Sequence, residues 1–191
     1  MLKNIVDSKE YGEVVCADFY RLSETPTWSW QNWMLDYQKS GGAMLDLHIH
    51  DVDFMHYVFG KPNSVTSRAT HKDAKYDAIT SIFDYDNMFV TVTGAWGMKS
   101  KYPFSVGFTV RFEEATLEYK GGTLMLYTDA EAKKIEVPSE NGYLSEVVDF
   151  IECIKSDKES SINTAETAKL SVEIALAENL SADKKETVKV L

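Results

Sequence analysis

Most of the side chains that could do chemistry lie in one stretch, residues 40–60, which reads SGGAMLDLHIHDVDFMHYVFG. Three of the four histidines of the chain are there, together with three aspartates: His48, His50, His56, Asp46, Asp51 and Asp53. Imidazole and carboxylate groups held close together can transfer protons near neutral pH, or they can bind a metal ion. The stretch is therefore the candidate functional site, and the element that carries it decides which chemistry is possible.

A β-strand is one way to place these residues. Over residues 45–50 apolar and polar side chains alternate, and such alternation is typical of a half-buried strand. A strand would put His48 and His50 on one face, in the manner of the His-x-His metal motif of amidohydrolases.

A helix fits a longer window, and it is the interpretation we favour. Over residues 44–59 the apolar side chains recur at helical spacing, and no turn residue interrupts the run before Gly60 and Pro62. The run is too long for an ordinary strand and suits a helix of about four turns. Asp46 and His50 are then i, i+4 neighbours, so the carboxylate can hold the imidazole and favour its charged form. The polar stripe of this helix comprises Asp46, His50, Asp53 and Tyr57.

This stretch also resembles a known family. GGAMLDLHIHDVDFMHYVFGKPNSV is similar to the motif that opens the catalytic helix in the second domain of the Gfo/Idh/MocA oxidoreductases, which include glucose-fructose oxidoreductase and inositol dehydrogenase. The family pattern reads G-G-G-x-x-x-D-x-G-x-H-x-x-D, then a helix, then G-x-P-x-x-V. The matching residues are Gly41, Gly42, Asp46, His50, Asp53, Gly60, Pro62 and Val65. Two positions depart from it, because Ala43 stands at the third glycine and His48 at the glycine between the aspartate and the histidine.

The resemblance covers nearly the whole chain and implies its fold. Residues 1–191 are expected to form a single α+β domain, a largely antiparallel open-faced β-sheet with helices packed on one face. The C-terminal domains of glyceraldehyde-3-phosphate dehydrogenase and dihydrodipicolinate reductase are similar. The family's Rossmann nucleotide-binding domain, with its catalytic lysine in an E-K-P motif, is expected to lie outside this chain, which has no G-x-G-x-x-G motif after a strand.

The resemblance also implies an activity. The complete enzyme is expected to be an NAD(P)-dependent oxidoreductase that acts on a CH–OH group of a sugar, cyclitol or related polyol. His50 would be the general base and Asp46 would orient it, while Trp28, Trp30, His48 and Asp53 would contact the substrate. NAD or NADP would be bound mainly by the missing domain, with no cofactor held by this chain, which alone would be inactive.

Two alternatives stay open at the level of sequence. The first is a metal-dependent hydrolase that uses Asp46, His48 and His50, although an amidohydrolase barrel needs about 250 residues and further ligands downstream. The second is a non-catalytic module that dimerises through an open sheet face.

Composition and charge restrict the partners. The net charge of −10, without a local cluster of Lys and Arg, argues against nucleic acid. No apolar run is long enough to span a bilayer and no leader is visible, which argues against a membrane and for a cytoplasmic protein. Cys16 and Cys153 are too few and too far apart for a disulfide framework or a cysteine zinc site.

Alternation after the central helix predicts a series of strands and assigns their faces. The expected apolar face carries Ile82, Val90 and Val92, with Ser81 on the opposite face. The expected members of that opposite, mixed face include Phe89, Thr91, Thr93 and Tyr119. The family resemblance implies that this face is left for a partner subunit in a homo-oligomer. Two amphipathic helices, 143–155 and 164–180, are expected to follow the sheet.

Overall fold

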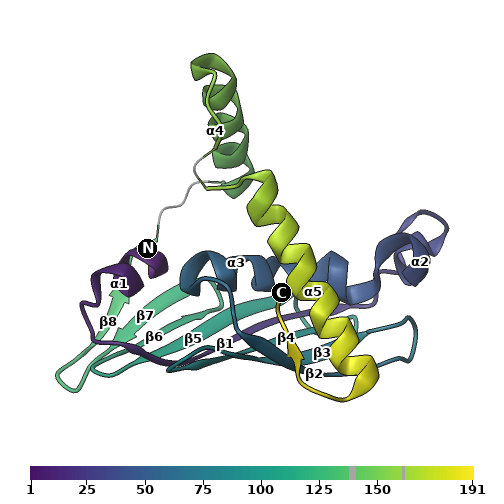
Figure 1. Ribbon diagram of the computed structural model, residues 1–191, viewed down its shortest axis with the longest axis horizontal. Helices are drawn as coiled ribbons and strands as arrows, with labels where there is room; N and C mark the ends of the chain where they lie inside the picture. Colours follow the sequence, from purple (N-terminus) through teal and green to yellow (C-terminus); the bar gives the residue numbers. More distant parts are fainter. Residues whose placement is uncertain (138–140, 161) are drawn as a thin grey trace.

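The computed structural model describes residues 1–137, 141–160 and 162–191, and this part of the chain forms a nine-stranded sheet with helices on one side (Figure 1). The strands are β1 Val14–Glu24, β2 Ser64–Thr70, β3 Ala78–Asp84, β4 Phe89–Met98, β5 Ser105–Phe112, β6 Thr116–Lys120, β7 Thr123–Tyr127, β8 Ala132–Ile135 and β9 Val188–Lys189. The helical segments are α1 Leu2–Ser8, η1 Trp30–Leu35, α2 Tyr37–Ser40, η2 Met44–His48, α3 Ile49–Phe59, α4 Gly142–Ser156 and α5 Ala165–Lys184.

The sheet is mixed but mostly antiparallel. Its strand order is β8-β7-β6-β5-β1-β4-β3-β2-β9. β1 pairs with β4 in parallel, and the other described pairs are antiparallel. Short connections join β3 to β4, and β5 to β6, β7 and β8 in turn, whereas the parallel neighbours β1 and β4 are joined by a long connection that contains α3, β2 and β3. The α+β fold with a largely antiparallel open sheet, expected from the sequence, is confirmed.

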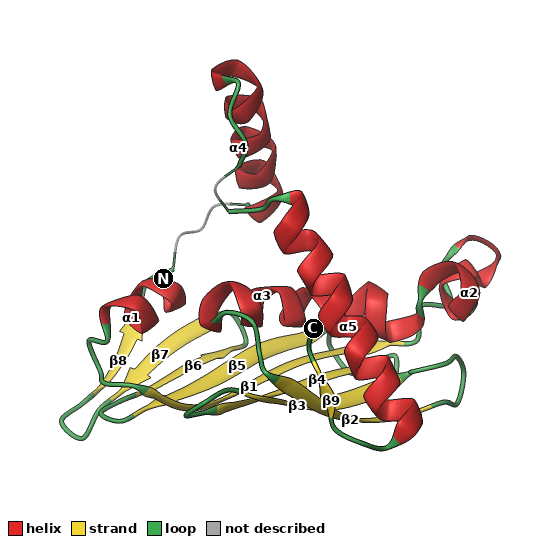
Figure 2. Ribbon diagram, in the orientation of Figure 1, coloured by secondary structure: helices red, strands yellow, loops and turns green. Residues whose placement is uncertain are grey.

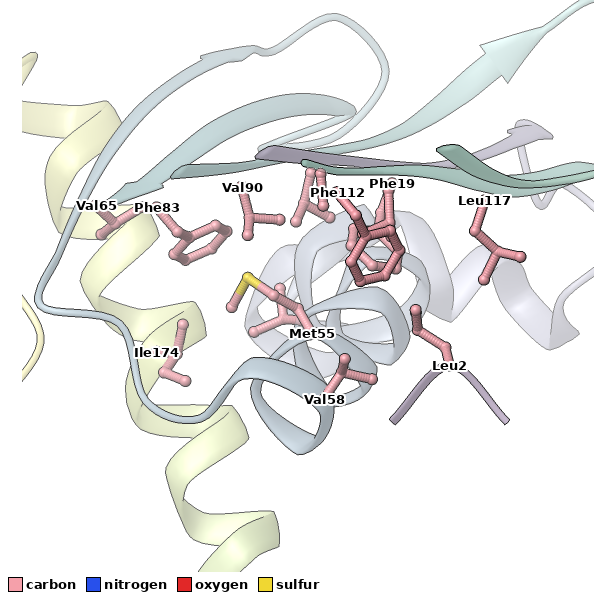
Figure 3. Packing of buried hydrophobic residues seen from close by; sticks show 14 of the residues in the cluster. Leu2, Phe19, Met55, Val58, Val65, Phe83, Val90, Phe112, Leu117 and Ile174 are labelled. Carbon is pink, nitrogen blue, oxygen red and sulfur yellow. The ribbon is translucent and has the colours of Figure 1, made fainter. Parts of the chain in front are cut away.

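Helices α1, α3 and α5 lie over one face of the sheet, and the other face carries no helix in the described chain (Figure 2). The core fills the layer between them, where Met55 of α3 and Ile174 of α5 meet Phe19, Phe83 and Val90 of the strands (Figure 3). Each of these side chains is at most 3% exposed. Burial of apolar area at this interface is what holds α3 against the sheet.

Helix α4 is the exception to this packing. It projects away from the sheet on the helix-covered side (Figure 1), and none of its residues is buried. Among the helices that the structure describes, none combines the length and the apolar character that crossing a membrane requires.

The faces of three residues differ from the sequence expectation. Ser81 is fully buried on the helix-covered face, where its hydroxyl lies 2.7 Å from that of Ser67, and Ile82 is 42% exposed on the open face. Tyr119 stacks on Phe108 beneath the helices, with ring centroids 5.7 Å apart. Alternation alone gives two sets of residues per strand, and the pairing of Ser81 with Val92 fixes which set faces the core. The expected faces of the two residues are therefore exchanged, with Ser81 under the helices and Ile82 on the open face. Tyr119, expected on the open face, lies on the helix-covered face.

Candidate functional site

The candidate site lies on a helix, as predicted. The first turn, η2 over Met44–His48, is a π-helix, and it continues directly into α3 over Ile49–Phe59. A π-turn widens the spacing between residues four apart, and such turns occur frequently at functional sites. The helix therefore spans the predicted residues, but its first turn, which carries Asp46, is not a regular α-helix.

Glycines set the path of the chain into this turn. Gly41 and Gly42 have φ of 77° and 69°, a left-handed conformation that suits glycine. A Cβ atom on Gly42 would lie 2.3 Å from the backbone oxygen of Lys75, so the close approach also excludes a side chain. Ala43, in contrast, has a φ of −57° and is fully buried, so a methyl group is accommodated where the family pattern has its third glycine.

His50 is exposed on this helix, and acidic groups lie on both sides of it along the chain. Burial raises the pKa of Asp46, and the nearby His50, when charged, acts in the opposite direction. The same charge helps to lower the pKa of Asp53. No hydrogen bond joins Asp46 to His50 among the described residues. The imidazole and the two carboxylates therefore interact through space and not through a direct hydrogen bond.

Asp53 is also tied to helix α5. The hydroxyl of Ser171 donates to Asp53 Oδ1 at 2.6 Å and lies 2.8 Å from His56 Nε2, while His56 Nε2 is 3.4 Å from Asp53 Oδ1. A nucleophilic triad needs serine and aspartate on the two different nitrogens of the histidine, and here both face Nε2. The cluster therefore links α3 to α5. The Asp53 side chain is still 54% exposed, so it remains accessible beside His50.

This cluster makes stability depend on pH. The hydrogen bond with His56, followed by that from Ser171, lowers the pKa of Asp53 in the folded state. A lowered carboxylate pKa stabilises the fold above the unfolded value of about 3.9, and this contribution is lost as the pH falls through the folded-state value. We expect the free energy of unfolding in urea to fall as the pH is lowered below about 4, and to fall less for Asp53→Asn than for the native chain. Asp129→Asn, at an exposed site, serves as the control, and equal pH profiles for Asp53→Asn and the native chain would contradict the assignment.

His48 lies inside the protein, where it cannot contact a substrate. Its side chain and that of Glu178 on α5 are both 0% exposed, and His48 Nε2 lies 2.7 Å from Glu178 Oε1. The imidazole packs against Gly94 of β4, where an added Cβ would lie 2.6 Å from His48 Cβ. The expectation that His48 binds substrate is therefore corrected. Two residues apart on a helix, His48 and His50 point in different directions, one into the protein and one to its surface.

The hydrolase alternative depended on His48 and His50 facing the same point. In the described ranges no group of three or more His, Cys, Asp or Glu side chains is arranged to hold a metal ion. The burial of His48 explains this, because its Nε2 is already engaged by Glu178.

An ion pair between Arg21 and Asp51 positions the helix. It was not identified from the sequence. Arg21 Nε lies 2.8 Å from Asp51 Oδ2, and Nη2 lies 3.0 Å from Oδ1. This two-point contact ties β1 to the residue that follows His50 and fixes the rotation of α3. The alternation of β1 could have indicated this ion pair, because Arg21 is on the same inward face as Ala17 and Phe19. A charged residue on that face needs a partner.

The tryptophans that precede the site are on the surface, with Trp28 75% and Trp30 76% exposed. Their loop is anchored by a small apolar cluster in which Met34 packs with Ala43 and Leu47 of the helix start and with Trp96 of β4. The loop is thus attached to the segment that carries Asp46. Trp96 is the buried tryptophan of the four, and it serves this packing.

The amino-acid sequence matches the profile of a known domain family. The sequence profile of the GFO/IDH/MocA C-terminal domain matches residues 1–118. A comparison with curated proteins gives no match.

Several solved structures share the fold. A levoglucosan dehydrogenase in complex with NADH and L-sorbose has a TM-score of 0.83 at 16% identity, covering 100% of this chain and 62% of that one. An NAD-binding oxidoreductase from Klebsiella pneumoniae has a TM-score of 0.82 at 18% identity, covering 100% and 62%. An oxidoreductase from Agrobacterium radiobacter in complex with NAD+, L-tartaric acid and magnesium has a TM-score of 0.79 at 18% identity, covering 99% and 60%.

At these identities the likeness concerns the fold, and the chain spans three fifths of the length of these structures. The profile match extends over more than half of the chain, from α1 through the motif of residues 41–65 to β6. The chain belongs to the Gfo/Idh/MocA family, as a C-terminal domain of that family's oxidoreductases.

Proposed function

We propose that this chain is the substrate-binding and oligomerisation domain of an NAD(P)-dependent dehydrogenase that oxidises a CH–OH group of a sugar, cyclitol or related polyol. The observation that carries the proposal is the exposed His50 between Asp46 and Asp53 on a helix whose motif matches the family. An imidazole at the surface, flanked by carboxylates, is suited to take a proton from a substrate hydroxyl.

In this proposal His50 acts as the general base. Its unprotonated nitrogen takes the hydroxyl proton, while the hydrogen on the same carbon would leave as a hydride, for which bound NAD+ or NADP+ would supply the acceptor. Asp46 and Asp53 stabilise the imidazolium that results. The half-buried Asp46 is the stronger candidate for this role, because partial removal from water strengthens its field.

Trp28 and Trp30 are proposed as the surface on which the substrate packs. The apolar faces of a sugar ring can cover indole rings that would otherwise be exposed to water. One structural relative supports this class of substrate, since structures of a levoglucosan dehydrogenase are complexes with L-sorbose and with levoglucosan. All of these ligands carry hydroxyl groups on carbon.

The protein is further proposed to use a dinucleotide cofactor, to form a homo-oligomer and to reside in the cytoplasm. NAD or NADP would be held mainly by a nucleotide-binding domain outside these residues, and NADH-bound relatives with longer chains support this. A homo-oligomer would form through the open sheet face, where Ile82, Phe89 and Tyr127 are 38% to 45% exposed. The two free cysteines, Cys16 and Cys153, fit a reducing cytoplasm.

The test is a substrate screen on the complete enzyme, with this chain joined to the nucleotide-binding domain from the same gene. Reduction of NAD+ and of NADP+ is followed with levoglucosan, glucose, myo-inositol and sorbitol as substrates. We expect turnover with at least one of these and none from residues 1–191 alone. A folded complete enzyme that binds NADH but oxidises none of them would overturn the proposed substrate class.

A further inference from the structure

Helix α4 presents an apolar surface that nothing in the described chain covers. Seven of its side chains are large, apolar and between 43% and 81% exposed: Tyr143, Leu144, Val147, Val148, Phe150, Ile151 and Ile154. At 100° per residue they occupy one side of the helix, and Glu146, Asp149 and Glu152 occupy the other. This is the pattern of a helix that packs one side against a partner.

Helix α4 needs a partner that packs against its apolar side. A helix of 15 residues is at the margin of stability in water, even with residues of high helix propensity. Helices of this length owe most of their stability to the packing of an apolar face, and α4 packs none of its own. Exposure of seven apolar side chains on one side also creates a patch that a soluble monomer rarely presents.

Helix α5 also exposes apolar side chains. Helix α5 buries Ile174 and Ala175 on one side and leaves Val172, Leu176 and Leu180 exposed on the other, at 42% to 52%. A groove of about 970 Å³ lies between α4 and the segment that leads into α5, with Phe150, Ile154 and Ile162 among its lining residues. A partner that covers these regions must be larger than a single peptide segment.

We propose that α4 and the exposed side of α5 dock the nucleotide-binding domain, an inference that rests on the proposed function. The structural relatives leave about 38% to 41% of their own chains without a counterpart here, enough for a separate domain. The N-terminus and α4 lie on the same, helix-covered side of the sheet (Figure 1), so a domain joined ahead of residue 1 can reach α4.

The candidate site lies on the side of the sheet where the nucleotide-binding domain would dock. Helix α3, which carries the exposed His50, is on the same side of the sheet as α4 (Figure 1). A domain held by α4 would therefore face the side of the molecule from which a cofactor must reach the site. The open sheet face, proposed above for a second copy of the chain, is on the opposite side, so the two partners would not compete (Figure 2).

Hydrogen–deuterium exchange tests the inference without requiring turnover. Exchange of the α4 amides, residues 142–156, is compared between the 191-residue chain and the complete polypeptide that includes the nucleotide-binding domain. We expect exchange in α4 to be slower in the complete polypeptide by on the order of tenfold or more, because the helix joins a larger cooperative unit. Ile151→Lys/Ile154→Lys should abolish this protection. Asp149→Gln/Glu152→Gln changes the net charge by the same amount on the polar side and should preserve it.

Two results would overturn the inference. One is α4 exchange that is equally fast in both proteins. The other is protection in the 191-residue chain that grows with its concentration, which would identify a second copy as the occupant. Failure of the dehydrogenase proposal is separate, because it would be seen as a lack of substrate oxidation in a complete polypeptide whose α4 is still protected.

Discussion

Replacement of His50 by alanine is expected to lower kcat of the complete enzyme by about 10²–10⁴-fold, the usual contribution of a general base. The expected fall concerns kcat more than KM, because the proton is transferred in the transition state. His50 is exposed and makes no hydrogen bond among the described residues, so the free energy of unfolding should change by less than about 0.5 kcal/mol. Steady-state kinetics and urea unfolding of the same preparation measure both quantities.

Chemical rescue distinguishes loss of the general base from a structural change at the site. Added imidazole should restore part of the activity of His50→Ala, and it should leave the native enzyme unchanged. Asp46→Asn keeps the size of the side chain but removes its charge, so a smaller fall in kcat is expected for it. A His50→Ala enzyme with native kcat would contradict the assigned role.

Replacement of Glu178 by alanine is expected to lower the free energy of unfolding by about 2–5 kcal/mol, the range for a large buried side chain shortened to alanine. Glu178 and His48 are both fully buried, and their 2.7 Å contact engages Nε2 of the histidine. Without the carboxylate, that nitrogen would stay in the core without a partner, beside a new cavity. Equilibrium unfolding in urea measures the loss.

The same helix provides the control for this prediction. Glu173 on α5 is exposed and pairs with Lys169 at 3.3 Å, so Glu173→Ala should change stability by less than about 0.5 kcal/mol. The double variant His48→Ala/Glu178→Ala should lose less than the sum of the two single variants, because the residues interact directly. Additive losses would show that the contact carries no coupling energy.

The sequence determined the elements of this protein because their signals are local. The helical period of residues 44–59, ended by Gly60 and Pro62, favoured a helix over a strand, and the structure has a helix there. Turn residues and alternation gave the strands and hence the α+β class. The motif with Asp46 and His50 identified the family, which the profile match confirms.

The tertiary structure decided which partners the inward side chains meet. His48 and Glu178 are 130 residues apart, and no local period links a histidine at the end of η2 to a glutamate on α5. Arg21 and Asp51 meet because β1 lies beneath α3, and Ser81 is buried while Ile82 is exposed because of strand pairing. Periodicity divides each element into two sides, but only packing between elements decides which side becomes the core.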